Sequence, residues 1–346
     1  MTPVFDGHND ALLRLWEAGG DPVALFAKDT GQVCLPAMAA GGMRGGFFAM
    51  FPVEAGLEDS VDFSALSKPA YDLPLPPPMA QATALTNVLE QAAIARALCD
   101  AGQMRMVRSM ADLDMSLEGD GPPALLLHLE GAEAIGPDLT ELDQLYDLGL
   151  RSIGPVWSRP TIFASGVAFR YPSTGDTGPG LTEAGRRLVN RARDKGMVVD
   201  LSHMTERGFW DVANEGLPLV ATHSNAHAVT PSSRNLTDAQ LRAIGETGGV
   251  AGLNFGSIFL RTDGRMDAGP ALDAAVAHLD HMIGVAGEDH VALGSDFDGA
   301  PMTEGLTRAS DLPNLIEAMR ARGYSDELVA KLCHGNWRRL LSDVLP

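Results

Sequence analysis

The chain has 346 residues, of which 45% are hydrophobic, and it contains 38 glycines and 22 prolines. This composition indicates a globular protein with a large core and many turns rather than a disordered chain. A formal net charge of -19 with no basic cluster argues against a nucleic acid or an anionic membrane as a partner.

Three cysteines, Cys34, Cys99 and Cys333, lie far apart in the sequence and form no CxxC pair. They predict neither a disulfide framework nor a thiolate zinc site. The first ten residues, MTPVFDGHND, lack the basic and apolar segments of a secretion signal. No apolar run reaches the roughly 20 residues of a transmembrane helix, so we expect a soluble, cytoplasmic protein.

Eight short apolar segments recur along the chain, and most of them are continuous rather than alternating. Continuous apolar runs are typical of parallel strands that are buried on both faces. The predicted strands cover residues 4–8, 43–51, 124–129, 150–157, 197–203, 217–223, 249–255 and 290–296.

Helical patterns separate these strands. They predict helices over 79–101, 139–148, 271–285 and 312–322, further helices after the N-cap residues Thr182, Thr205 and Thr237, and a closing helix over 325–341. Strands that alternate with helices indicate a parallel sheet. Eight repeats without a dinucleotide-binding fingerprint favour a closed α/β barrel of the (β/α)8 TIM type. We expect a single domain over residues 1–346.

Two connections, at about 52–78 and 160–180, are too long to be simple turns. Both follow the carboxyl ends of predicted strands, where the active sites of such barrels are built. They are consistent with walls or lids over a pocket, and equally with surface decoration or an oligomer contact.

Side chains that can bind a metal follow five of the predicted strands. His8 and Asp10 stand two residues apart at the end of the first strand, so both point to the same face. The other strand ends carry Glu130, His203, His223, Asp296 and Asp298. Each alone fits a structural role, but together at one end of a barrel they predict a metal site. The number of ligands favours two zinc ions that hydrolyse an amide, ester or phosphoester, and no GxSxG nucleophile motif is present.

Five motifs occur in a characteristic order: HND at 8–10, LEG at 129–131, DLSH at 200–203, THSNA at 222–226 with SRN at 233–235, and GSDFDG at 294–299. This set resembles the membrane (renal-type) dipeptidase family of zinc peptidases, which belongs to the amidohydrolase group of metal-dependent barrels. The resemblance covers nearly the whole chain. It implies a dipeptidase with two zinc ions per subunit and a homodimeric assembly.

The resemblance also implies a ligand set. One zinc would be bound by His8 and Asp10, the other by His203 and His223, and Glu130 would bridge the two. A hydroxide between the metals would attack the scissile carbonyl of the peptide bond.

Three further positions are matched by the resemblance. Asp296 would take the proton of the attacking water and pass it to the leaving amine. Arg234 matches the arginine that holds the terminal carboxylate of the substrate. Trp157 stands where the family usually has a substrate-contacting histidine. Because an indole cannot carry a positive charge, stabilisation of the oxyanion would fall to the zinc ions or to Arg159.

The leading hypothesis is hydrolysis of dipeptides, extended to peptides with a C-terminal D-residue, which family members tolerate. One alternative is a metal-dependent amidase, deacylase or lactonase that acts on N-acyl amino acids or other blocked substrates. Another is a catalytically silent ligand-binding barrel. His227 and His334 match no motif position, and we interpret both as structural.

Overall fold

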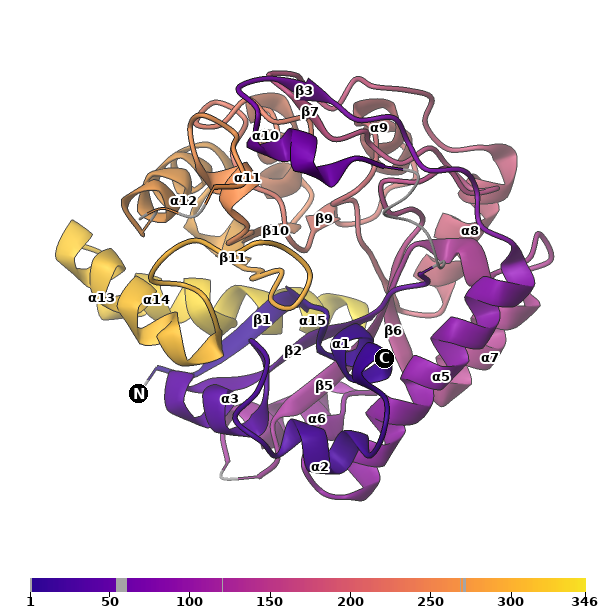
Figure 1. Cartoon of the computed structure of the whole chain (residues 1–346), viewed down its shortest axis with the longest axis horizontal. Helices are drawn as coiled ribbons and strands as arrows, with labels where there is room; N and C mark the ends of the chain where they lie inside the picture. Colours follow the sequence, from indigo (N-terminus) through magenta and orange to yellow (C-terminus); the bar gives the residue numbers. More distant parts are fainter. Residues whose placement is uncertain (1, 54–60, 120, 268, 270–271) are drawn as a thin grey trace.

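The computed structural model of the chain describes residues 2–53, 61–119, 121–267, 269 and 272–346. Eight parallel strands form the centre of the molecule (Figure 1). They are β1 (Val4–Asn9), β2 (Met43–Met50), β5 (Ala124–Glu130), β6 (Leu150–Gly154), β8 (Val198–Val199), β9 (Val220–Ala221), β10 (Val250–Leu253) and β11 (Val291–Leu293). All eight lie within or next to the predicted segments.

Two sheets share these strands and meet at both edges. One sheet has the order β1-β2-β5-β6-β8, with the short strand β4 (Arg105–Met106) beside β5, and the other has the order β11-β10-β9. A parallel bridge joins Asp200 to Val220, and a second joins Asn9 to Phe297. These bridges close the ring, and the predicted TIM-type barrel is confirmed.

The helices surround the barrel. They are α1 (Ala11–Ala18), α2 (Pro22–Phe26), α3 (Leu35–Gly41), α5 (Gln81–Asp100), α6 (Met110–Leu117), α7 (Thr140–Leu148), α8 (Glu183–Asp194), α9 (Glu206–Ala213), α10 (Asp238–Glu246), α11 (Ser257–Leu260), α12 (Leu272–Ala286) and α13 (Leu312–Arg322). Thr182, Thr205 and Thr237 cap α8, α9 and α10, and each side chain accepts a hydrogen bond from the backbone N–H three residues later, as predicted. Among the described residues, no helix combines the length and the apolarity that a membrane crossing requires.

The predicted closing helix is confirmed, and it contains a π-helical turn that the sequence pattern did not indicate. It consists of α14 (Asp326–Ala330), a π-helical turn (Lys331–Gly335) and α15 (Asn336–Val344). The extra residue in the π-turn accompanies two hydrogen bonds to β11: Asn336 Nδ2 donates to Val291 O and Trp337 Nε1 to Leu293 O.

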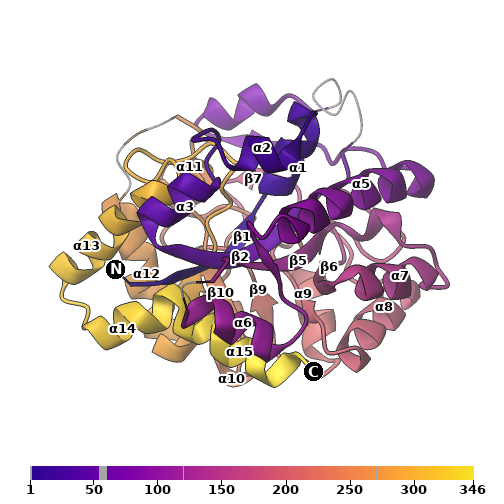
Figure 2. The ribbon, with the colours of Figure 1, turned by 90° about the horizontal axis from the view of Figure 1, so that it is seen from below.

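Helix α15 lies across the end of the barrel opposite to α1 and α2 (Figure 2). Trp337 is fully buried there and packs with Phe5 and Phe47 in the part of the core that α15 covers. Glycine at position 7 makes room for the indole, because a Cβ atom there would lie 2.6 Å from Trp337 Cζ2. This end of the barrel is therefore a packed floor, and the opposite end carries the polar residues.

The two long connections lie together over the polar end. Strand β3 (Tyr71–Asp72) in the first pairs in antiparallel fashion with β7 (Arg170–Tyr171) in the second. The 3-10 turn Phe63–Ser67 and Leu73 join them in a small apolar cluster with Phe259. Residues 54–60 of the first connection lie outside the described residues. Both connections line the central cavity, which favours the interpretation as walls over surface decoration.

Candidate active site

The predicted ligand residues meet at the carboxyl end of the barrel. His8 and Glu130 lie at the ends of β1 and β5, and His203, His223 and Asp296 follow β8, β9 and β11. All are at least nine-tenths buried. Strands β8 and β9 are shorter than predicted, because Asp200 Oδ1 accepts from the backbone N–H groups of both Ser202 and Thr222 and replaces ladder hydrogen bonds.

One group of ligand atoms surrounds His8. Its Nε2 atom lies 3.3 Å from Asp10 Oδ2, 3.6 Å from Glu130 Oε2 and 4.0 Å from Asp296 Oδ1. Both ring nitrogens of His8 are buried without a hydrogen-bond partner among the described residues. An unpartnered Nε2 atom beside three carboxylates fits a bound divalent metal ion, which would satisfy it.

A second group surrounds the other oxygen of the same glutamate. Glu130 Oε1 lies 3.0 Å from His203 Nε2 and 3.5 Å from His223 Nε2, and the two Nε2 atoms are 3.1 Å apart. Glu130 therefore presents one carboxylate oxygen to each ligand group. This arrangement suits a carboxylate that bridges two metal ions.

Hydroxyl groups hold both histidines of the second group. Ser158 Oγ lies 2.9 Å from His203 Nδ1, and Thr222 Oγ1 lies 2.8 Å from His223 Nδ1. Thr222 Oγ1 in turn donates to Asp200 Oδ2 at 2.7 Å, so it is free to accept from His223 Nδ1–H. A proton on Nδ1 leaves the Nε2 lone pair directed at the site, as a metal ligand requires.

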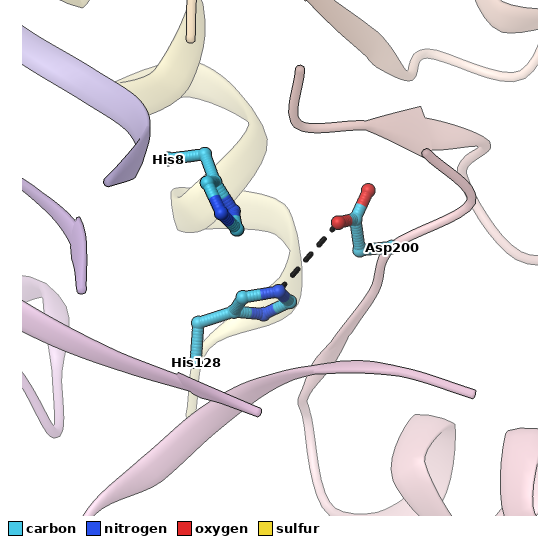
Figure 3. Close-up of side chains that lie close together, drawn as sticks. All are labelled: His8, His128 and Asp200. Carbon is cyan, nitrogen blue, oxygen red and sulfur yellow. Dashed lines mark ion pairs between the residues drawn. The ribbon is translucent and has the colours of Figure 1, made fainter. Parts of the chain in front are cut away.

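A third group of possible ligands lies deeper in the barrel (Figure 3). His128 Nε2 is 3.6 Å from Asp200 Oδ2, its Nδ1 is 2.9 Å from Ser152 Oγ, and its ring meets that of His8 edge to face at 5.5 Å. His128 and Asp200 were not among the predicted site residues. The available signal was spacing, since His128 lies two residues before Glu130 on the same strand and shares its face.

Burial determines the charge states of the site. It lowers the pKa of His203 and His223 well below 6.5, which keeps both rings in the neutral form that binds metals. Burial also opposes a charge on His8, but the carboxylates of Glu130, Asp10 and Asp296 outweigh it and raise the pKa of His8 to about 10. Burial raises the pKa of Glu130 and Asp296. The site therefore attracts positive charge.

The site opens into a cavity of about 950 Å³. Asp10, Glu130, His203 and Asp296 line it, and the other lining residues come from α1, α5, the long connections and the segments after β10 and β11. A cavity of this size is adequate for a small organic substrate.

Comparison with known proteins identifies the family. A family model described as membrane dipeptidase, peptidase family M19, matches residues 1–345. The chain belongs to this family. A solved metallopeptidase of Rhodobacter sphaeroides, bound to a phosphinate mimic of the dipeptide L-Ala-D-Ala, is 48% identical, with a TM-score of 0.93 over 99% of each chain.

Two further relatives are similar to this chain. The solved metallopeptidase called dipeptidase AC is 47% identical, with a TM-score of 0.92 over 100% of this chain and 99% of its own. A protein encoded in the pqqA 5′ region of Klebsiella pneumoniae is 48% identical over 70% of this chain and 90% of its own length. The chain is thus a metal-dependent dipeptidase, a hydrolase acting on peptide bonds.

Arg234 of this dipeptidase lies beside the second ligand group. Its guanidinium donates to Ser202 O and, at 3.1 Å, to Ser224 Oγ, and its Nη2 atom is 3.2 Å from His203 Nε2. Burial lowers the pKa of Arg234 to about 10, so the group keeps its charge at neutral pH. Its Nε atom has no hydrogen-bond partner among the described residues. A cation next to the ligands is suited to hold an anionic end of a substrate.

Trp157 lines the cavity, whereas Arg159 lies behind it. Arg159 is 1% exposed, its Nη1 atom is 3.3 Å from Glu133 Oε1, and its guanidinium sits 5.6 Å from the Trp157 ring. The suggestion that Arg159 stabilises the oxyanion is wrong, because its charge is paired with Glu133 and faces the back of the indole.

Asp296 and Asp298 both have left-handed backbone, with φ of 63° and 64°. This conformation is rare for residues other than glycine, and the two carboxylates contact different partners. Asp296 Oδ2 accepts from Asn254 Nδ2 at 2.8 Å, and its Oδ1 faces His8. Asp298 instead pairs with Arg14 at 3.0 Å and accepts from the backbone N–H groups of residues 32 and 33. His227 contacts Ser173 O at 3.0 Å, outside the ligand groups.

Proposed function

We propose that the chain is a binuclear zinc dipeptidase that cleaves dipeptides with a free amine and a free carboxylate. The observation that carries the proposal is the orientation of Glu130, which presents one oxygen to each of two ligand groups. The phosphinate mimic of L-Ala-D-Ala in the Rhodobacter sphaeroides relative supports extending the substrates to those with a C-terminal D-residue.

His8 and Asp10 would hold one zinc ion, His203 and His223 the other, and Glu130 both. Neutral imidazoles with carboxylate oxygens are a donor set that zinc prefers. When bound, two zinc ions supply a Lewis acid for the scissile carbonyl and a water of lowered pKa.

We assign the proton transfers to Asp296. Asn254 holds its Oδ2, while Oδ1 faces the ligand group and the cavity. Oδ1 accepts the proton of the attacking water and delivers it to the amide nitrogen as the C–N bond breaks. One water is consumed, and a free amine and a carboxylate are formed.

Arg234 would bind the terminal carboxylate of the substrate. Its charge and unpartnered Nε atom support this role. The carboxylates of Asp10 and Asp296 would favour the free amine at the other end of the peptide. Charges at both ends select a peptide of two residues.

The remaining expectations stay predictions. They are a single domain over residues 1–346, a homodimer and a cytoplasmic location. A mass in solution measured by light scattering tests the assembly, and a monomeric mass would remove the homodimer.

Hydrolysis of a peptide panel tests the function. Zinc-loaded protein is given L-L and L-D dipeptides, together with N-acetylated and C-amidated controls, with and without a chelator. We expect chelator-sensitive cleavage only of peptides with both free ends. Cleavage of N-acylated substrates alone would indicate the deacylase alternative, and no cleavage with two zinc ions bound would contradict the proposed substrates.

A further inference from the structure

A row of aromatic rings forms one wall of the cavity. We define the aromatic wall as Phe51, Trp157, Phe169 and Phe259, which all line the cavity. Successive ring centroids are separated by 5.1, 5.9 and 6.4 Å. The middle of the wall lies next to the second ligand group, because the Trp157 and Phe169 rings lie 5.9 and 6.5 Å from the ring of His203.

Another part of the cavity lining mixes apolar and polar side chains. Helix α1 contributes Leu13, Trp16 and Glu17 to the lining, and α5 contributes Thr83 and Asn87. In the aromatic wall, Phe51 and Trp157 follow β2 and β6, Phe169 lies in the second long connection, and Phe259 lies on α11. In Figure 1, α1 lies near the centre and α5 at the right, while α11 and β7 lie toward the top. Among the described residues that line the cavity there is no lysine or arginine. Arg234, which is not part of this lining, is assigned to the terminal carboxylate of the substrate, so an acidic side chain would lack a cation of its own.

Arg234 relates the wall to one end of the substrate. Its guanidinium lies 5.3 Å from the Phe259 ring centroid and its Nη2 atom 3.2 Å from His203 Nε2. A peptide whose terminal carboxylate is held by Arg234 has its C-terminal residue beside Phe259. The nearest surfaces for the side chain of that residue are then Phe259, Phe169 and Trp157.

The wall is held in place from behind. Arg159 lies between Glu133 and the rings of Trp157 and Phe51, 5.6 and 5.9 Å from their centroids. The β3–β7 pair secures the connection that carries Phe169. A preformed apolar surface binds a side chain without a cost for ordering its own residues. The cavity volume is near the upper end of the roughly 300–1,000 Å³ of ligand sites, which leaves room for a large side chain.

We propose that the aromatic wall is the subsite for the C-terminal side chain, and that the preferred substrates are dipeptides with a large apolar or aromatic C-terminal residue. This proposal rests on the dipeptidase function proposed above. Trp157, in the place of the family's usual histidine, is its main determinant, because the indole extends the apolar surface up to the second ligand group.

A substrate series tests the proposal. The zinc-loaded enzyme is given L-Ala-X, where X is glycine, alanine, aspartate, leucine or phenylalanine, the last two also as D-residues. We expect kcat/KM for leucine or phenylalanine to exceed that for glycine roughly tenfold or more, and aspartate to be the poorest. In Trp157→Ala the ratio of phenylalanine to glycine falls roughly tenfold through KM, while cleavage of L-Ala-Gly persists. Trp157→His also lowers the ratio of kcat/KM for phenylalanine to that for glycine.

The matched control is Trp210→Ala, which removes a half-buried indole on α9 away from the cavity lining. It leaves the ratio unchanged. If Trp157→Ala does not fold, Phe169→Leu provides the comparison, with a smaller loss of the ratio. Equal kcat/KM for all X, or a ratio unchanged by the wall variants, would overturn the subsite and leave the dipeptidase function intact. No cleavage of any dipeptide by protein with two bound zinc ions would overturn both.

Discussion

Replacement of Asp200 by asparagine tests how the second ligand group is oriented. Asp200 accepts four hydrogen bonds, two each from Ser202 and Thr222, and Oδ2 receives the Thr222 hydroxyl at 2.7 Å. In Asp200→Asn the amide nitrogen can take the Oδ2 position and donate to Thr222 instead. The Thr222 hydroxyl then turns to donate to His223 Nδ1, 2.8 Å away, which moves the imidazole proton to Nε2. A protonated Nε2 cannot bind a metal.

Loss of a supporting partner of this kind typically lowers metal affinity 10- to 100-fold, which corresponds to about 1.4–2.8 kcal/mol. We expect a loss of this size at one of the two zinc sites only, since His8 and Asp10 do not contact Thr222. Competition with a chromogenic chelator measures both dissociation constants. Thr222→Val, which removes the hydroxyl, also lowers the affinity for zinc at the second ligand group.

The matched control is Asp298→Asn. Asp298 also accepts several hydrogen bonds near the site, but from Arg14 and the backbone of residues 32 and 33 rather than from a group that holds a ligand. We expect the Asp298→Asn variant to have a lower free energy of unfolding but an unchanged affinity for zinc. Wild-type affinity at both sites in Asp200→Asn would refute the role of Asp200.

Three other predictions concern catalysis, pH and the floor of the barrel. Asp296→Asn retains both zinc ions, measured by mass spectrometry, but loses roughly 10²- to 10⁴-fold in kcat; wild-type turnover would remove the proton-transfer role. Because His8 has a pKa of about 10 in the metal-free protein, zinc must displace its proton. Zinc affinity therefore rises with pH between 6 and 9, with protons released in calorimetric titrations, and a pH-independent affinity would contradict the charge on His8. Trp337→Ala lowers the unfolding free energy of the metal-free protein by about 3–5 kcal/mol in urea titrations, since a fully buried indole is lost; a change below about 1 kcal/mol would show that the floor repacks.

The barrel and the clustering of the candidate ligand residues could be predicted because both follow from local signals. Buried parallel strands are continuous apolar runs, and a threonine before a helical pattern caps it regardless of tertiary context. Strand ends of a barrel meet at one face, so His8, Glu130 and His203 could be grouped although they lie far apart in sequence.

The features that escaped prediction depend on contacts between distant segments. The π-turn before Asn336 accompanies hydrogen bonds from α15 to β11. Arg159 was placed in the site by its sequence proximity to Trp157, but its charge is paired with Glu133 from another loop. Asp200 resembled an ordinary residue before a histidine, and only the folded barrel brings it to Thr222 and His128.

The central claim is that Glu130 bridges two zinc ions in a dipeptidase. Stepwise addition of zinc to metal-free protein, with hydrolysis of L-Ala-D-Ala followed at each step, tests it most directly. We predict that activity reaches its maximum at two equivalents of zinc, and that Glu130→Gln retains fewer than two ions and little activity. Full activity at one equivalent, or two tightly bound ions in Glu130→Gln, would contradict the account.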